Sequence, residues 1–172
     1  MNDNRGVKIR NAFEAVLRFM VYRVLRLDLS EESWANLIQF VRFCIVGLTN
    51  TIIGYLIYAV TLKSLRLAGL WPSTDIYAAQ LVMFLLSVLW SFYWNNRYVF
   101  RQENGEKRNM FKSLMKAYAS YAFTGLFLSE LLLLLWVNVL SINEYVAPIL
   151  NLIITVPLNF LIQKYWTFKR AD

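Results

Sequence analysis

The stretch LVMFLLSVLW at residues 81–90 decides the fold, because it contains no charged side chain. It lies at the centre of an apolar block from about 76 to 98, and a helix needs about 20 apolar residues to cross the hydrocarbon core of a bilayer. Three further blocks of similar length occur at about 40–62, 114–137 and 145–166. We therefore predict an all-α integral membrane protein with four transmembrane helices.

The composition agrees with this prediction and excludes several classes of protein. Of the 172 residues, 58% are hydrophobic and 17% are charged, whereas a soluble domain has about 25% charged residues. The net charge of +7 arises mostly from Lys and Arg beside apolar blocks, so anionic phospholipid is the expected partner and nucleic acid is not. The single cysteine, Cys44, excludes an internal disulfide, and there is no histidine.

The distribution of Lys and Arg predicts the orientation of the helices. The linker after the first block holds only Lys63 and Arg66, and the linker between the third and fourth blocks holds neither residue type. With four crossings, sixteen of the eighteen positive charges fall on one side of the membrane. We expect that side to be cytoplasmic and to hold both termini.

The N-terminal residues 1–37 differ from the four-helix domain that we place at 38–170. Residues 7–27 are apolar but include Lys8, Arg10, Arg18, Arg23 and Arg26. This pattern is typical of an amphipathic helix at the membrane interface, and a loose cytoplasmic tail is the alternative. Next, Asp28 and Ser30 predict a break and an N-cap, so that a new helix would begin there and continue into the first span.

The ends of the second and fourth spans resemble each other. SFYWNNRYVFR at 91–101 aligns without gaps on NFLIQKYWTFK at 159–169, so that Phe92 matches Phe160 and Phe100 matches Phe168. More weakly, Arg42 matches Lys116. We therefore predict two repeated hairpins with the same orientation, related by an axis along the membrane normal. Chance similarity between aromatic and basic span ends is the alternative.

Three stretches resemble the GtrA family. They are RFCIVGLTNT at 42–51, FYWNNRYVF at the end of the second span and NFLIQKYWTF at the end of the fourth. The resemblance covers roughly residues 38 to 170. It implies a bacterial inner-membrane protein of polyprenyl-phosphate-linked sugar metabolism, which moves such lipids across the membrane or assists the glycosyltransferases that make or use them.

Cations and amides gather at the predicted cytoplasmic ends of the spans, where a lipid phosphate would lie. Several cations and amide donors around one anion are what phosphate binding needs, although flanking positive charge alone is expected at such ends. The candidate phosphate-binding and lipid-binding residues are Arg42, Asn95, Asn96, Arg97, Lys116 and Lys164.

Polar residues recur along the spans themselves. Small and hydroxyl side chains usually serve helix packing, but an idle buried amide is costlier, so we predict a polar groove for a sugar head. Its candidate lining residues are Asn50, Ser91, Asn151, Asn159 and Gln163. Glu130 in the third span could pair with Lys63 or Arg66, take up protons or simply be solvated near the outer rim.

No arrangement for catalysis is found. The aspartates are scattered, and there is no Gly-rich phosphate loop and no Ser–base pair. We expect no enzyme, no metal and no cofactor. The expected function is binding of polyprenyl (undecaprenyl) phosphate, bare or sugar-linked, and participation in its transbilayer movement, in a homo-oligomer. The alternative is an accessory protein that recruits a membrane glycosyltransferase. A small multidrug-type exporter would need an acid early in its first span, and this span has none.

Overall fold

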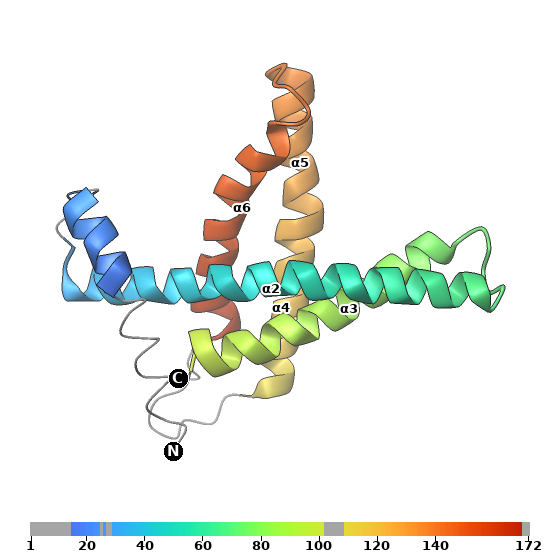
Figure 1. Ribbon diagram of the computed structural model, residues 1–172, viewed down its shortest axis with the longest axis horizontal. Coiled ribbons are helices and arrows are strands. Elements are labelled where there is room, and N and C mark those ends of the chain that lie inside the picture. Colours follow the sequence, from blue (N-terminus) through green and yellow to red (C-terminus); the bar gives the residue numbers. More distant parts are fainter. Residues whose placement is uncertain (1–14, 25, 27–28, 102–108, 170–172) are drawn as a thin grey trace. The chain divides into compact units, whose positions relative to one another are not determined.

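The computed structural model describes residues 15–24, 26, 29–101 and 109–169, and these ranges contain helices and no strand (Figure 1). Several helices include π-helical turns, which carry the letter η. In chain order the elements are η1 (Phe19–Val24), α2 (Glu31–Leu67), α3 (Asp75–Trp94), η2 (Asn95–Val99), α4 (Met110–Ala122), η3 (Phe123–Leu128), α5 (Ser129–Leu134), η4 (Leu135–Val139), α6 (Ala147–Ile162) and η5 (Gln163–Thr167).

Four continuous helices are long and apolar enough to cross a bilayer, which confirms the prediction of an all-α membrane protein with four spans. They run over Glu31–Leu67, Asp75–Val99, Met110–Val139 and Ala147–Thr167. The first begins well before residue 40 because Ser30 caps it. The Ser30 Oγ accepts a hydrogen bond from the Ser33 N–H at 3.2 Å.

The chain forms two compact units, Met1–Val41 and Arg42–Asp172. In the first unit, Val21, Trp34 and Ile38 form a small buried core. The Arg18 guanidinium lies 4.8 Å from the centre of the Trp34 ring, a cation–π contact. Residues 1–14 and Asp28 lie outside the described residues, so the interfacial helix over 7–27 stays a prediction.

In the second unit, α2 and α3 form the first hairpin. Helix α2 ends at Leu67, and Gly69 follows with a φ of +63°, a conformation that glycine adopts without strain. At the turn, the Arg66 Nε donates to Asp75 Oδ2 at 2.7 Å. Nearer the middle, a Cβ at Gly54 would lie 3.7 Å from atoms of Met83 and Ser87, so the two helices are close there.

The third and fourth spans form the second hairpin (Figure 1). Asn151 of α6 links the helices, because its Oδ1 accepts from Trp136 Nε1 at 2.9 Å and its Nδ2 donates to the Ser129 carbonyl at 2.9 Å. Lower down, the Ser120 Oγ donates to Asn159 Oδ1 at 3.0 Å. Such bonds between spans hold helices together where lipid removes the hydrophobic drive for association.

The π-helical turns support the predicted repeat. η2 and η5 occupy matching positions of the aligned stretches, and each begins at an amide residue, Asn95 or Gln163. The Phe100 N–H donates to the Asn95 carbonyl at 2.7 Å, and the Phe168 N–H donates to the Gln163 carbonyl at 2.8 Å. The second helix of each hairpin therefore ends with the same local geometry. The match extends upstream to further buried pairs: Ala79 with Ala147 and Ser87 with Thr155.

Contacts between the repeats follow a two-fold pattern. Phe92 stacks on Phe168 with ring centroids 5.5 Å apart, and the matching pair, Phe160 and Phe100, stacks at 5.9 Å. Phe100 and Phe168, which match each other, stack at 4.7 Å. Such an exchange of equivalent contacts is what a two-fold axis produces, so this axis passes close to the Phe100 and Phe168 rings.

Candidate functional site

A cleft of about 490 Å³ lies at the end of the second span. We call it the η2 cleft. Among the described residues, its lining comes from the last turn of α3, from η2 and from the residue that follows Phe100: Tyr93, Asn96, Arg97, Tyr98 and Arg101. The cleft therefore combines two guanidinium groups, one amide and two phenol rings.

Spacing explains why part of the lining shares one face. Tyr93 and Arg97 are four positions apart, which is close to one helical turn, and Arg101 follows just after η2 ends at Val99. The Arg97 Cζ lies 5.8 Å from the centre of the Tyr98 ring, so the ring helps to orient the guanidinium. The exposed side chains of Arg97, Tyr93 and Tyr98 leave the cleft accessible.

An aromatic ladder supports the cleft from within α3. The Trp94 ring stacks on Tyr98 at 5.2 Å between centroids and meets Trp90 edge to face at 5.4 Å. Tyr93 also contacts Trp94, at 5.2 Å. These rings limit the rotation of the two tyrosines, and aromatic side chains with polar tips suit the level of the lipid head groups. Chemically, the cleft can hold an anion carried by a lipid.

The three consecutive candidates at the end of the second span do not all line the η2 cleft. Asn96 and Arg97 line the η2 cleft, whereas Asn95 is 1% exposed and points into the helix bundle. There the Asn95 Nδ2 donates to Ser91 Oγ at 3.1 Å and to the Tyr121 hydroxyl at 3.3 Å. Neighbouring residues of a helix point about 100° apart, so Asn95 faces the bundle while the two residues after it face the cleft.

The other predicted cations lie elsewhere. Lys116 Nζ donates to the Trp166 carbonyl at 3.0 Å and lies 5.6 Å from the Trp166 ring centre. Lys164 Nζ lies 5.3 Å from the Tyr165 ring centre, on the matching end of the fourth span. Arg42 is half-buried on α2. None of these three lines the η2 cleft, and their role in phosphate binding stays a prediction.

The predicted groove residues are largely engaged in helix packing. Ser91 shares a 2.6 Å hydrogen bond with Tyr121, and Asn151 and Asn159 join α6 to the third span. Gln163 is fully buried, and neither of its amide atoms has a hydrogen-bond partner among the described residues. Asn50 is half-buried on α2. Within one chain, Ser91, Asn151 and Asn159 tie helices together, and none of the five predicted groove residues lines the η2 cleft.

Some functional candidates escape the sequence analysis. Tyr93, Tyr98 and Arg101 line the cleft, and the four-residue spacing of Tyr93 and Arg97 is the signal that could have found Tyr93. Tyr121 is the centre of the buried network, and nothing in its apolar surroundings marks it. Glu130 is exposed on α5, while Arg66, one of its two suggested partners, pairs with Asp75.

Comparison with known proteins finds sequence relatives of this chain. The model of the GtrA/DPMS transmembrane domain matches residues 42–168. The chain is 25% identical over 129 residues to YwcD of Bacillus subtilis (strain 168), an uncharacterized membrane protein, covering 75% of this chain and 95% of YwcD. It is 26% identical over 125 residues to GtcA of Listeria monocytogenes, a cell wall teichoic acid glycosylation protein, covering 70% and 86%. No solved structure matches.

Proposed function

The chain belongs to the GtrA/DPMS transmembrane-domain family, and from this premise we propose that it binds a polyprenyl phosphate, bare or sugar-linked, and takes part in moving it across the bilayer. The lipid would be undecaprenyl phosphate in a bacterial inner membrane. The relative GtcA bears the name of a cell wall teichoic acid glycosylation protein, which supports a role of this chain in glycosylation of the cell envelope.

The η2 cleft is the observation that carries the proposal. Arg97 and Arg101 offer planar donors that suit phosphate oxygens, and Asn96 adds an amide from the same face. The cleft lies at the end of a transmembrane helix, which is the depth of a lipid phosphate. By the distribution of Lys and Arg, this end and both termini would be cytoplasmic.

Movement of a sugar head would need more than one copy of the chain. Some polar residues of the spans are occupied by bonds between helices, as at Ser120 and Asn159, while the amides of Asn50, Asn95 and Gln163 keep buried atoms without a hydrogen-bond partner among the described residues. Large apolar side chains are exposed on every span, for example Leu48, Leu81, Phe127 and Ile153. A homo-oligomer would place a lipid path between copies, with the cations of the η2 cleft at its entrance.

The test is reconstitution in liposomes with a short-chain polyprenyl-phosphate sugar. We expect binding and transbilayer movement with the wild-type chain, and loss of both with Arg97→Ala plus Arg101→Ala. Lys112→Ala is the matched control, because Lys112 is an exposed cation on α4 that does not line the cleft. Wild-type binding that is unchanged in the double variant would contradict the site.

The second candidate function is that of an accessory protein without transport. The separate unit Met1–Val41 favours it, because Val16 and Phe19 are each 59% exposed there and could contact a membrane glycosyltransferase. A stoichiometric glycosyltransferase in pull-downs from detergent, with no polyprenyl lipid retained, would support this alternative. Loss of the partner on deleting residues 1–29 would assign the contact.

A further inference from the structure

A second cationic and aromatic groove lies on α2, near its C-terminal end. It has a volume of about 450 Å³, and the residues that give it chemical character are Tyr55, Tyr58, Lys63 and Arg66. We call it the α2 groove. Like the η2 cleft, it combines two phenol rings with two cations.

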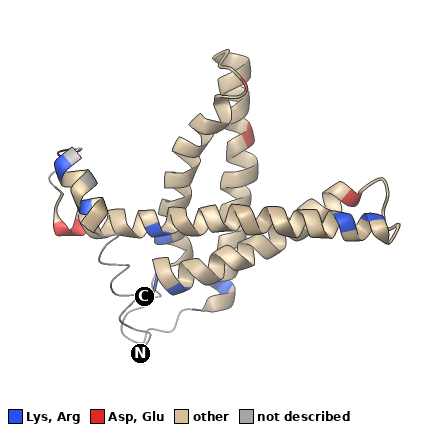
Figure 2. Ribbon diagram, in the orientation of Figure 1, with Lys and Arg blue, Asp and Glu red and all other residues tan. Residues whose placement is uncertain are grey.

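The two cations of the α2 groove stand out in the charge distribution. Lys63 and Arg66 are the two positive residues on their side of the membrane when the chain crosses four times. Positive residues are disfavoured on that side, and yet both line one groove. Figure 2 shows positive charge near the C-terminal end of α2 and, separately, beyond the C-terminal end of α3.

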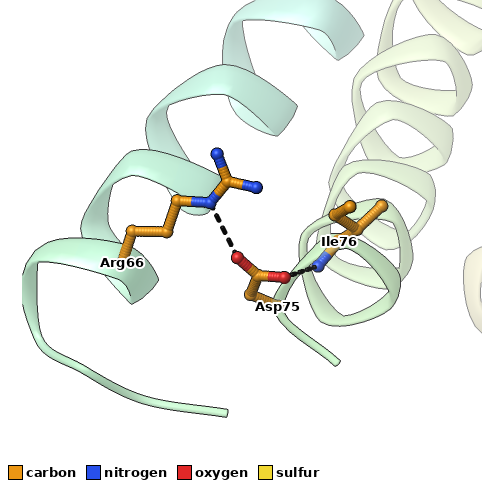
Figure 3. Close-up of polar contacts among 3 residues, drawn as sticks. All are labelled: Arg66, Asp75 and Ile76. Carbon is orange, nitrogen blue, oxygen red and sulfur yellow. Dashed lines mark hydrogen bonds and ion pairs between the residues drawn. The ribbon is translucent and has the colours of Figure 1, made fainter. Parts of the chain in front are cut away.

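Asp75 holds Arg66 in an orientation suited to a ligand. The Arg66 Nε donates to Asp75 Oδ2 at 2.7 Å, while Asp75 Oδ1 accepts from the Ile76 N–H at 2.8 Å. The Asp75 side chain is 10% exposed and that of Arg66 is 59% exposed. Figure 3 shows the two terminal nitrogens of the guanidinium directed away from the carboxylate. The carboxylate therefore fixes the near edge of the guanidinium, and its far edge remains available to an anion.

The rest of the groove suits a lipid chain better than a free anion. Below the cations, Leu62, Ala59 and Tyr55 continue the same face of α2 toward the middle of the span, at spacings of one helical turn. A phosphate at Lys63 and Arg66 would place its hydrocarbon chain along this stripe. A soluble anion would use only the cations.

The two sites lie on different helices, α2 and α3–η2, but the second span connects them. Asp75, which orients Arg66, begins α3, and Arg97 of the η2 cleft follows its end. At 1.5 Å per residue they are roughly 33 Å apart along the axis, close to the ~30 Å thickness of the hydrocarbon core. We propose that the α2 groove binds a lipid phosphate in the opposite leaflet, as the counterpart of the η2 cleft. The inference rests on the proposed function and adds to it a second phosphate site, at the opposite end of the lipid path from the η2 cleft.

The experiment is photo-crosslinking in proteoliposomes. The probe is a short-chain polyprenyl phosphate with a diazirine near the phosphate, and labelled peptides are mapped by mass spectrometry. We expect wild-type chain to be labelled within residues 55–67 and within 93–101. Lys63→Gln plus Arg66→Gln plus Asp75→Asn, which leaves amides to replace the ion pair, should lower labelling of 55–67 by about ten-fold or more and leave 93–101 unchanged.

The outcomes separate the two proposals. Wild-type labelling of 93–101 alone would overturn the α2 groove and leave the proposed function standing, whereas labelling of neither segment would overturn the proposed function. Labelling of 55–67 that survives the triple substitution would overturn the role of the cations. Loss of labelling of 55–67 on adding inorganic phosphate would indicate a site for free phosphate. Equal labelling of 55–67 by a phosphatidylglycerol probe would indicate a general lipid contact. Either would overturn the assignment to polyprenyl phosphate. Lys112→Gln is the matched control and should change neither segment.

Discussion

The two π-helical ends of the repeats, η2 and η5, share a backbone and differ in chemistry. Each closes with the same hydrogen bond, from Phe100 or Phe168 to the carbonyl five residues earlier. On the outside, however, η2 presents Arg97 between two tyrosines, whereas the matching position of η5 is Tyr165. On the inside, Asn95 has hydrogen-bond partners, and the amide of Gln163 has none among the described residues.

This difference distinguishes structural features that both repeats share from the ligand-binding cleft that we assign to one of them. Stacked phenylalanines and π-helical turns recur in both halves, so they belong to the common architecture. The cationic cleft is found at one half, together with the amide network that stiffens the helix behind it. Substitutions of shared features should therefore lower the stability of the whole helix bundle. Substitutions in the cleft should lower ligand binding and leave stability unchanged.

The largest effect is expected from Phe100→Ala, which removes a shared feature. Phe100 contacts Phe43, Phe160 and Phe168. Because lipid replaces water as the reference solvent, the loss is chiefly one of packing, and we expect about 2–3 kcal/mol of lost stability. Thermal unfolding in detergent measures it, with Phe100→Leu as the milder control. An unchanged melting temperature would show that the aromatic cluster does not hold the repeats together.

Next in size is the loss of ligand from the η2 cleft. Arg97→Ala plus Arg101→Ala should weaken the binding of polyprenyl phosphate about 100-fold, since each hydrogen bond to a charged group contributes about 1.5–3 kcal/mol. Lys164→Ala plus Lys169→Ala, which removes two cations from the end of the other repeat and includes the match of Arg101, should cost about ten-fold or less. Titration of the lipid into detergent-solubilised protein compares them. Equal losses would mean that the two ends bind alike and that the comparison fails.

A smaller effect is expected inside the bundle at Asn95. Asn95→Leu removes hydrogen bonds to Ser91 and Tyr121. The bond to Tyr121 joins two spans, and such bonds contribute on average about 0.6 kcal/mol and at most about 1.7. With the bond to Ser91 in the same span, we expect roughly 1 kcal/mol of lost stability. Tyr121→Phe should give a similar loss and should not add fully to it, because both substitutions break the same network. A double-mutant cycle of unfolding free energies tests this.

The smallest effect is expected from Gln163→Leu. The Gln163 side chain is fully buried without a hydrogen-bond partner among the described residues. Replacing an unsatisfied buried amide by an apolar group is close to neutral or stabilising, so the change should lie within about 0.5 kcal/mol of wild type or above it. A loss as large as that of Asn95→Leu would reveal a partner for Gln163 in the membrane, for example in a second copy of the chain.

Hydropathy and charge suffice to predict the four spans, because crossing lipid constrains length and composition strongly. The repeat is also readable, since Phe92 and Phe100 keep their spacing at Phe160 and Phe168. The binding site is harder to predict from the sequence. Runs such as Asn95, Asn96 and Arg97 look like one cluster in a sequence, but helical rotation sends the first inward and the last outward.

The amide stripe of the fourth span shows a second limit. Asn151 and Asn159 are spaced for one face, as a groove requires, but the same spacing serves helix packing. Only the positions of Trp136, Ser129 and Ser120 decide between the two. Those partners come from another span, and their register cannot be derived from the spacing of Asn151 and Asn159 alone.

The most direct test of the central claim is native mass spectrometry of the protein purified from bacterial membranes in mild detergent. We predict that the wild-type chain retains a polyprenyl phosphate, bare or sugar-linked, and that Arg97→Ala plus Arg101→Ala loses it while Lys112→Ala keeps it. A wild-type chain that carries only ordinary phospholipid, or a double variant that retains polyprenyl phosphate fully, would contradict the assignment of the η2 cleft.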